Sequence, residues 1–133
     1  GLSFLLIDAC RSVGIPARFV GTPMWYNDSG NHSWVEIWDG EWHFTGAAEP
    51  VENQLNQVWF ADLASKAKIG DMKYGIFAAT WNKHDLYFPM DWLPGIKKYN
   101  AVDVTDRYLT KTKIVSEEIL WFPEISIFLI ISE

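Results

Sequence analysis

Three residue types that support acyl-transfer chemistry occur in the first half of the chain. His32 precedes an alternating apolar run, Glu49 follows that run, and Cys10 is the only cysteine. A thiolate attacks an amide carbonyl, an imidazole moves the proton, and a carboxylate orients the imidazole and stabilises its charged form. These residues therefore raise the hypothesis of thiol chemistry, and their positions decide which of them can take part.

Cys10 is unsuitable as the nucleophile because it belongs to a helical pattern. Apolar residues recur at three- and four-residue spacing over 2–13, which predicts a helix that Gly14 ends. Phe4 and Ile7 widen the apolar stripe, as expected for a helix buried on most sides. Near the C-terminal end of such a helix, the macrodipole and apolar surroundings both disfavour a thiolate. We expect Cys10 to be a buried small hydrophobic residue.

A β-hairpin is predicted over 31–44. Asp39-Gly40 favours a two-residue turn, which would pair Trp42 with Ile37. This register predicts an apolar face that packs on the helix, formed by Val35, Ile37, Trp42 and Phe44. The other face would carry His32, Trp34, Glu36, Trp38, His43 and Thr45.

Glu49 is the predicted acid. If strand pairing continues beyond the hairpin, Glu49 lies diagonally across from His32, at about 7–8 Å between backbones and within reach of a glutamate side chain. The alternatives are a solvated Glu49 in a turn before Pro50 and a His32 that caps the strand or is exposed. His43 is interpreted as a surface or wall residue, and His84 receives no role.

Two tryptophans share the predicted face of His32. Trp34 and Trp38 are candidates for the walls of a substrate cleft, although core packing is the favoured alternative for such large aromatic residues. Glu36 lies between them and is either an ion-pair partner for Arg18 or an exposed strand residue.

The remaining elements predict an α+β fold in which a buried N-terminal helix packs on an antiparallel sheet. Further elements are expected as strand 17–21, helix 56–68, strand 74–81, loop 86–95, and strands over 101–106 and from residue 113 onward. Residues 1–110 are assigned to this core, and 111–133 to a β segment, either the start of a following domain or a last strand of the sheet.

Composition narrows the classes of function. The 133 residues are 49% hydrophobic and 21% charged, which predicts one soluble globular domain. A net charge of −6 without a basic cluster argues against a nucleic-acid partner. One cysteine excludes an internal disulfide and a cysteine-based zinc site, and no Asp-rich loop has calcium-ligand spacing. No cofactor and no metal are expected.

The two ends of the sequence suggest a piece of a longer protein. The chain enters a helical pattern directly after Gly1, and no signal peptide is visible. The apolar stretch from Ile119 to Ile131 is shorter than the roughly 20 residues of a membrane-spanning helix and suits a buried strand. We expect both ends to be cut from something larger and no membrane span.

Several motifs together resemble the transglutaminase-like core of the papain-like superfamily. They are Cys-Arg-Ser-Val-Gly-Ile-Pro-Ala-Arg at 10–18, His-Ser-Trp-Val-Glu-Ile-Trp at 32–38 and Gly-Glu-Trp-His-Phe at 40–44. Gly-Ala-Ala-Glu-Pro at 46–50 is similar to the bacterial branch of that superfamily. The resemblance covers roughly residues 1–60.

The resemblance implies a Cys-His-acid triad with His32 as the general base. The implied cysteine lies at the start of the helix, where the helix N-terminus and an imidazolium activate it and backbone donors stabilise the oxyanion. By the family's pattern it belongs one or two positions before Gly1, so this chain alone is expected to be inactive. The usual aspartate of relatives corresponds to Gly46, and Glu49 is the predicted substitute.

Two functions follow as expectations. The first is a thiol hydrolase or acyltransferase acting on amide bonds of a peptide or protein, with protease, amidase and cross-linking transferase left open. The alternative is a non-catalytic, tryptophan-rich module that binds a peptide or glycan on the same fold. The residues encoded before Gly1 distinguish the two. Relatives are often exported, which favours an exported or periplasmic location in bacteria without deciding it.

Overall fold

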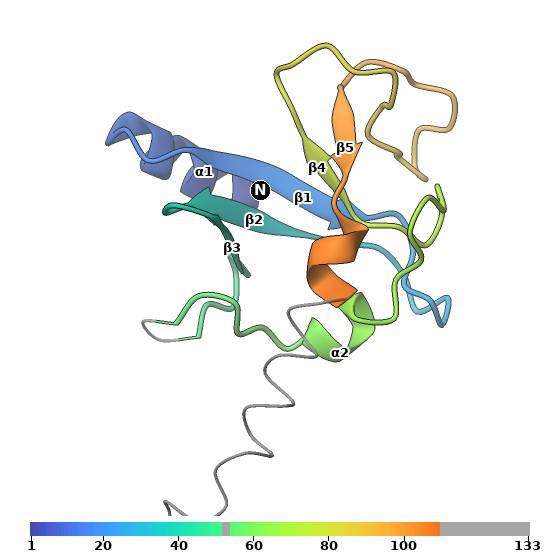
Figure 1. The fold of residues 1–133 in the computed structure, drawn as a ribbon, viewed down its shortest axis with the longest axis horizontal. Coiled ribbons are helices and arrows are strands. Elements are labelled where there is room, and N and C mark those ends of the chain that lie inside the picture. Colours follow the sequence, from blue (N-terminus) through green and yellow to red (C-terminus); the bar gives the residue numbers. More distant parts are fainter. Residues whose placement is uncertain (52–53, 110–133) are drawn as a thin grey trace, which may run out of the picture.

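The computed structural model describes residues 1–51 and 54–109, which form a helix packed on an antiparallel sheet (Figure 1). The elements in chain order are α1 (Leu2–Ser12), β1 (Ala17–Thr22), β2 (His32–Trp38), β3 (Trp42–Thr45), α2 (Ala61–Ala64), β4 (Phe77–Ala79) and β5 (Ala101–Asp103). The five strands follow the order β3-β2-β1-β4-β5, and each neighbouring pair is antiparallel. The predicted α+β fold class is confirmed.

Some predicted elements are shorter than expected. The helix predicted over 56–68 forms only as Ala61–Ala64, and the strand predicted over 74–81 only as Phe77–Ala79. The last described residues, 105–109, are helical where a strand had been predicted to continue to 106. The strand predicted from residue 113, the β segment 111–133 and the apolar stretch 119–131 lie outside the described residues. Within the described part of the chain, no helix has the length and apolar character needed to cross a membrane.

Gly14 ends α1 as predicted. The N–H of Gly14 donates to Arg11 O at 3.0 Å, and the N–H of Ile15 donates to Cys10 O at 2.9 Å. This double closure is a Schellman motif, and it requires the left-handed φ of 82° at which glycine carries no steric penalty. The Arg11 guanidinium also donates to Ala17 O at 2.7 Å. The end of α1 is therefore fixed to the start of β1.

The prediction that α1 is buried on most sides is wrong for the described residues. Ile7 is buried against Ala17 and Val35, and Phe4 stacks on Phe19 with ring centroids 5.0 Å apart. Leu5 on the other side of the helix is 66% exposed. The sheet covers one face of α1, and no other element among residues 1–51 and 54–109 covers the opposite face.

The register of the hairpin differs by one residue from the prediction. Trp38 pairs with Trp42 and Ile37 with His43, so residues 39–41 form a three-residue loop in place of a two-residue turn. Within this loop the Asp39 N–H donates to Glu41 O at 3.0 Å. Because side chains alternate along a strand, the shift turns every side chain of β3 to the opposite face.

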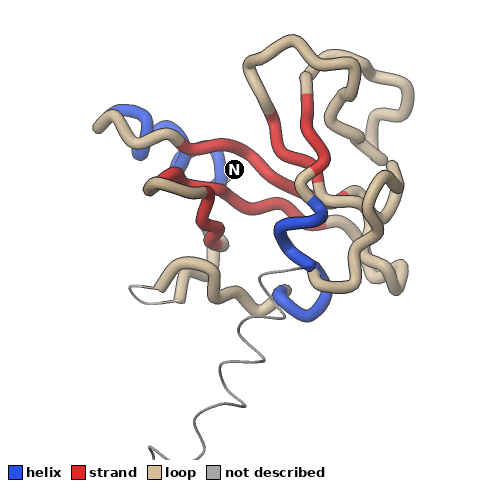
Figure 2. Tube along the Cα trace, viewed as in Figure 1, coloured by secondary structure: helices blue, strands red, loops and turns tan. Residues whose placement is uncertain are grey.

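The sheet consequently has two distinct faces. The helix face carries Val35, Ile37, His43 and Thr45 together with Ala17 and Phe19, and α1 packs on it. The tryptophan face carries His32, Trp34, Glu36, Trp42 and Phe44. The largest apolar cluster covers the tryptophan face and includes Trp25, Phe60, Ala64, Ile76 and Tyr108. Figure 2 shows α2 beside the helical residues 105–109, away from α1.

A buried polar network ties residues 105–109 to the sheet. Glu36 is 2% exposed and accepts a 2.7 Å hydrogen bond from Arg18 Nε and a 2.8 Å bond from the Tyr108 hydroxyl. That hydroxyl in turn accepts the Trp34 indole N–H at 2.7 Å. Burial, together with the Glu36 carboxylate, raises the pKa of Tyr108 well above its ordinary value. Of the two alternatives left open for Glu36, the ion pair with Arg18 is confirmed and the exposed strand residue is wrong.

Candidate active site

His32 begins β2 and lies among aromatic rings. Its ring centroid is 4.8 Å from that of Phe60, 5.1 Å from that of Trp59, and 6.0 Å from those of Trp25 and Trp34. The side chain retains an exposed fraction of 23%. Burial in this apolar environment lowers the pKa of His32 from its ordinary value of 6.5, and the Glu49 carboxylate opposes that effect. The environment therefore favours a neutral imidazole, the form that can accept a proton.

Glu49 faces this imidazole. Its Oε1 lies 3.5 Å from His32 Nε2, beyond the common range of about 2.7–3.2 Å for N–H···O hydrogen bonds. The same Oε1 accepts the Trp59 indole N–H at 3.1 Å. Nε2 is buried and has no hydrogen-bond partner among the described residues. The contact therefore has the distance of an ion pair, within about 4 Å.

Glu49 reaches His32 through a turn and not through strand pairing. The ladder between β2 and β3 ends at the pair Val35–Thr45, so the premise that pairing continues to Glu49 is wrong. The Glu49 side chain instead folds back over Gly46, where a Cβ would lie 3.1 Å from Oε1 and 3.3 Å from Cδ. The absence of a side chain at residue 46 leaves the space that the carboxylate occupies.

Asn56 anchors the segment that follows Glu49. Its N–H donates to Phe44 O at 2.8 Å, its side-chain Oδ1 accepts the Phe44 N–H at 3.0 Å, and Nδ2 lies 2.8 Å from His43 Nδ1. Asn56 has a left-handed φ of 64°, which asparagine tolerates better than most residues. These bonds join Asn56 to the outer edge of β3. The loop that leaves β3 after Thr45 therefore returns to the same strand at Asn56.

Of the two predicted substrate-binding tryptophans, Trp34 lies beside His32 and Trp38 lies at the far end of β2. Trp34 is fully buried and donates its indole N–H to Tyr108, so it forms the floor beneath His32 and presents no surface to a substrate. Trp38 is 42% exposed and contacts Trp42 at 5.3 Å, at the opposite end of β2 and roughly 20 Å along the strand from His32. Core packing, the alternative reading, describes Trp34.

The other two histidines have local contacts. His43 lies on the helix face and contacts Asn56, so the prediction that it shares the face of His32 is wrong because of the register shift. His84 accepts the Leu86 N–H at 3.4 Å in an exposed loop.

Three aromatic residues around His32 escaped the sequence analysis. Trp25 comes from the loop after β1, and Trp59 and Phe60 precede α2. The segment Val58-Trp59-Phe60 lies within the predicted helix 56–68, and that prediction conceals its role. The signal in the sequence is two aromatic residues beside a valine just before a short helix, but nothing local indicates that they meet His32.

Cys10 and His32 occupy opposite faces of the sheet. Cys10 packs with Ile7, Ala17 and Val35 on the helix face, whereas the imidazole lies on the tryptophan face with Trp34. The interposed sheet prevents this sulfur from serving His32. Cys10 is half-buried, a little more accessible than expected, and remains part of an apolar cluster.

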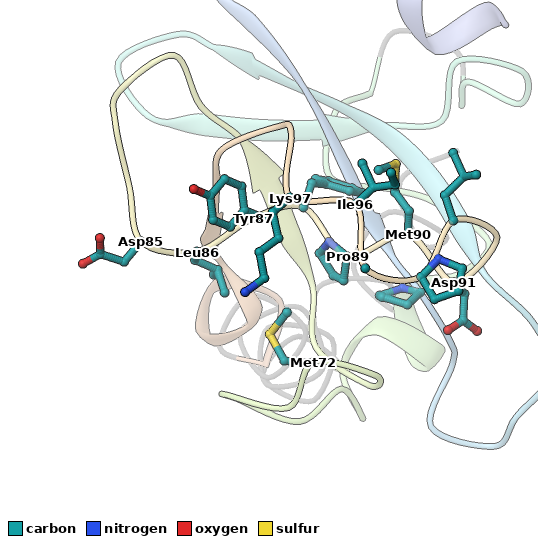
Figure 3. A pocket seen from close by; sticks show the side chains of 14 residues that line it. Met72, Asp85, Leu86, Tyr87, Pro89, Met90, Asp91, Ile96 and Lys97 are labelled. Atoms are coloured by element: carbon teal, nitrogen blue, oxygen red, sulfur yellow. The ribbon is translucent and has the colours of Figure 1, made fainter.

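Two surface cavities lie away from His32 and Glu49. One of about 400 Å³ is lined by residues of the loop after β4, including Tyr87, Pro89, Met90 and Ile96 (Figure 3). Another of about 450 Å³ lies between α1 and β4 and is lined by Phe4, Phe19 and Trp81 among others. Neither lining includes His32 or Glu49. Within the described residues, no three His, Cys, Asp or Glu side chains are grouped as metal ligands.

Comparison with known proteins points to the family that the motifs resemble. Residues 1–47 match the model of the transglutaminase-like superfamily. The matched segment runs from α1 through β3 and contains His32, while Glu49 and Trp59 follow it. No curated protein and no solved structure matches the chain. The match supports a transglutaminase-like domain, a family of the cysteine hydrolase and acyltransferase type.

Proposed function

We propose that this chain carries the general base and the acid of a transglutaminase-like thiol hydrolase or acyltransferase that acts on amide bonds in peptides or proteins. The single observation that carries the proposal is the approach of Glu49 Oε1 to within 3.5 Å of His32 Nε2, inside the aromatic surroundings of the imidazole. The similarity of residues 46–50 to the bacterial branch is part of this proposal.

The two imidazole nitrogens would have separate roles. Nε2 faces the Glu49 carboxylate at 3.5 Å, so the proposal assigns the other ring nitrogen, Nδ1, to the thiol. The thiol proton passes to Nδ1, and the thiolate attacks the amide carbon. The amine then leaves with the proton from the imidazolium, and a thioester remains. Water or a second amine releases the acyl group. Glu49 stabilises the imidazolium that forms in between.

The nucleophile is the component that the proposal takes from the sequence resemblance. Cys10 is separated from His32 by the sheet, so we assign the thiol to a residue one or two positions before Gly1. α1 packs on the helix face, and His32 lies on the tryptophan face. A thiol carried before α1 must therefore reach His32 around the ends of β1 and β2. Without that thiol, residues 1–133 alone would not turn a substrate over.

The test begins with the codons directly before Gly1. An in-frame cysteine one or two positions upstream supports the proposal, and a start codon directly before Gly1 contradicts it. The extended protein is then assayed for hydrolysis of fluorogenic peptide amides and for incorporation of a fluorescent primary amine into casein.

The role of Glu49 is tested in that extended protein. Glu49→Gln should lower turnover by a factor on the order of 10⁴, because the base loses its orienting carboxylate. Asp91→Asn, a change in the loop beside the distant cavity, is the matched control and should leave turnover unchanged. Equal turnover of the Glu49→Gln variant and the parent would remove Glu49 from the mechanism.

The exposed tryptophans favour the second candidate, a non-catalytic module that binds a peptide or glycan. Trp59, Trp81 and Trp92 are each more than half exposed, and exposed indoles are common in recognition surfaces. They belong to separate segments, near α2, after β4 and in the loop before β5. Retention on a peptide or glycan array without turnover by the extended protein would support this module over the enzyme.

A further inference from the structure

Trp59 is exposed in a way that core packing does not explain. Its exposed fraction is 61%, whereas Trp25 and Trp34 in the same aromatic cluster are 3% and 0% exposed. The indole N–H nevertheless donates to Glu49 Oε1 at 3.1 Å, and the ring meets the His32 ring edge-on at 5.1 Å. The one polar atom of the Trp59 side chain, Nε1, is therefore hydrogen-bonded to the carboxylate that faces the imidazole.

We propose that Trp59 is a positioning residue that holds the Glu49 carboxylate beside His32. The inference rests on the proposed function for its catalytic meaning, but the contact itself can be tested without any turnover. Trp59 would act through Glu49 and not by touching the reacting atoms.

Glu49 needs such a partner because little else fixes it. It lies in a turn outside the β-ladder, and its side chain is 37% exposed. Among the described residues, the Trp59 indole is the one hydrogen-bond donor to Glu49. The Glu49 side chain otherwise only occupies the space that the missing side chain of Gly46 leaves. A glutamate held only by that space would rotate into water at little cost, since it would there regain full solvation.

Trp59 itself is fixed by its neighbours in the chain, as a residue that positions Glu49 must be. Its neighbours Val58 and Phe60 are both buried in the cluster on the tryptophan face. The Trp59 ring also packs at 88° against the Phe60 ring, with centroids 5.6 Å apart. The backbone on both sides is anchored in the core, so the indole projects from a fixed point toward Glu49.

The test is a double-mutant cycle read on the His32 imidazole by NMR titration of residues 1–133. Trp59→Phe keeps an aromatic ring and removes the N–H. It is measured alone and combined with Glu49→Gln. The Glu49 carboxylate raises the pKa of His32, so Trp59→Phe should lower that pKa when the carboxylate is released. In the Glu49→Gln background, Trp59→Phe should cause no such lowering.

Two controls separate positioning from general damage. Trp81→Phe, at an exposed indole that lies against Arg11 of α1, should leave the His32 titration unchanged. The chemical shifts of His43 report whether the neighbouring β3 edge remains intact. An unchanged or raised His32 pKa in Trp59→Phe, or an equal shift in both backgrounds, would overturn the proposal. If the coupling is present but the extended protein shows no turnover, the positioning contact holds and the enzymatic function fails.

Discussion

Gly46 and Glu49 share one small volume at the end of the hairpin. A Cβ built on Gly46 would lie 3.1 Å from Glu49 Oε1, tighter than about nine in ten contacts of real Cβ atoms. The glutamate therefore occupies the place from which a side chain at residue 46 would project. The match to the transglutaminase-like superfamily ends at residue 47, so the carboxylate that faces His32 comes from just beyond the matched residues.

Gly46→Ala should displace Glu49 from His32. The clash is with the flexible end of a glutamate side chain, so we expect a stability change within about 0.5 kcal/mol by urea unfolding. The pKa of His32 should fall, because the carboxylate that raises it moves away. NMR titration of His32 measures this.

Gly40→Ala, in the hairpin loop, is a poor control because its φ of 77° adds backbone strain. Gly1→Ala, with open space around it, is a suitable one. A His32 titration identical to that of the parent would show that the two residues do not compete.

Folding stability should fall as the pH drops below the ordinary histidine pKa. Burial lowers the pKa of His32 below 6.5, so the unfolded chain binds this proton more readily than the folded one. The contribution is fully present above 6.5 and is lost as the pH falls toward the folded-state value. Urea midpoints measured across this window should decline less steeply in His32→Gln. His84→Gln, at an exposed loop histidine, should follow the parent curve. Parallel curves for the parent and His32→Gln would contradict the burial argument.

Tyr108→Phe should destabilise the fold by about 1–3 kcal/mol. The change leaves the buried Trp34 N–H and Glu36 Oε1 without this partner, and an unsatisfied buried polar group carries its full desolvation cost. Urea unfolding at neutral pH measures the difference. As a comparison, Asp62→Ala removes an exposed, solvent-screened pair with Lys66 and should cost clearly less. A loss for Tyr108→Phe no larger than that for Asp62→Ala would show that the network contributes little.

The first half of the fold was predictable because its signals are local. Gly14 ended the helix at the expected place, and the alternating run after His32 predicted β2. The predicted register of the hairpin is wrong by one residue. Asp39-Gly40 fits a two-residue turn, but Glu41 also belongs to the loop in the folded chain. Loop length depends on how both strands pack, and a dipeptide signal does not contain that information.

The site was less predictable because its contacts are non-local. Residues 56–60 read as helix, yet Asn56 adopts a left-handed conformation to bond β3, and Phe60 enters the core. That departure is what carries Trp59 to Glu49. The exposure of α1 was likewise missed, since an apolar stripe indicates what a helix can bury and not which elements cover it.

The most direct test of the central claim measures how fast a thiol before α1 is alkylated as a function of pH. The protein is extended by its native upstream residues, and iodoacetamide labelling is followed by mass spectrometry in the parent and in His32→Ala. The account predicts rapid labelling of the upstream cysteine well below the free-cysteine pKa of about 8.5, a loss of that reactivity in His32→Ala, and slow labelling of Cys10 in both. An upstream thiol that titrates like free cysteine in both proteins, or a Cys10 that reacts first, would contradict it.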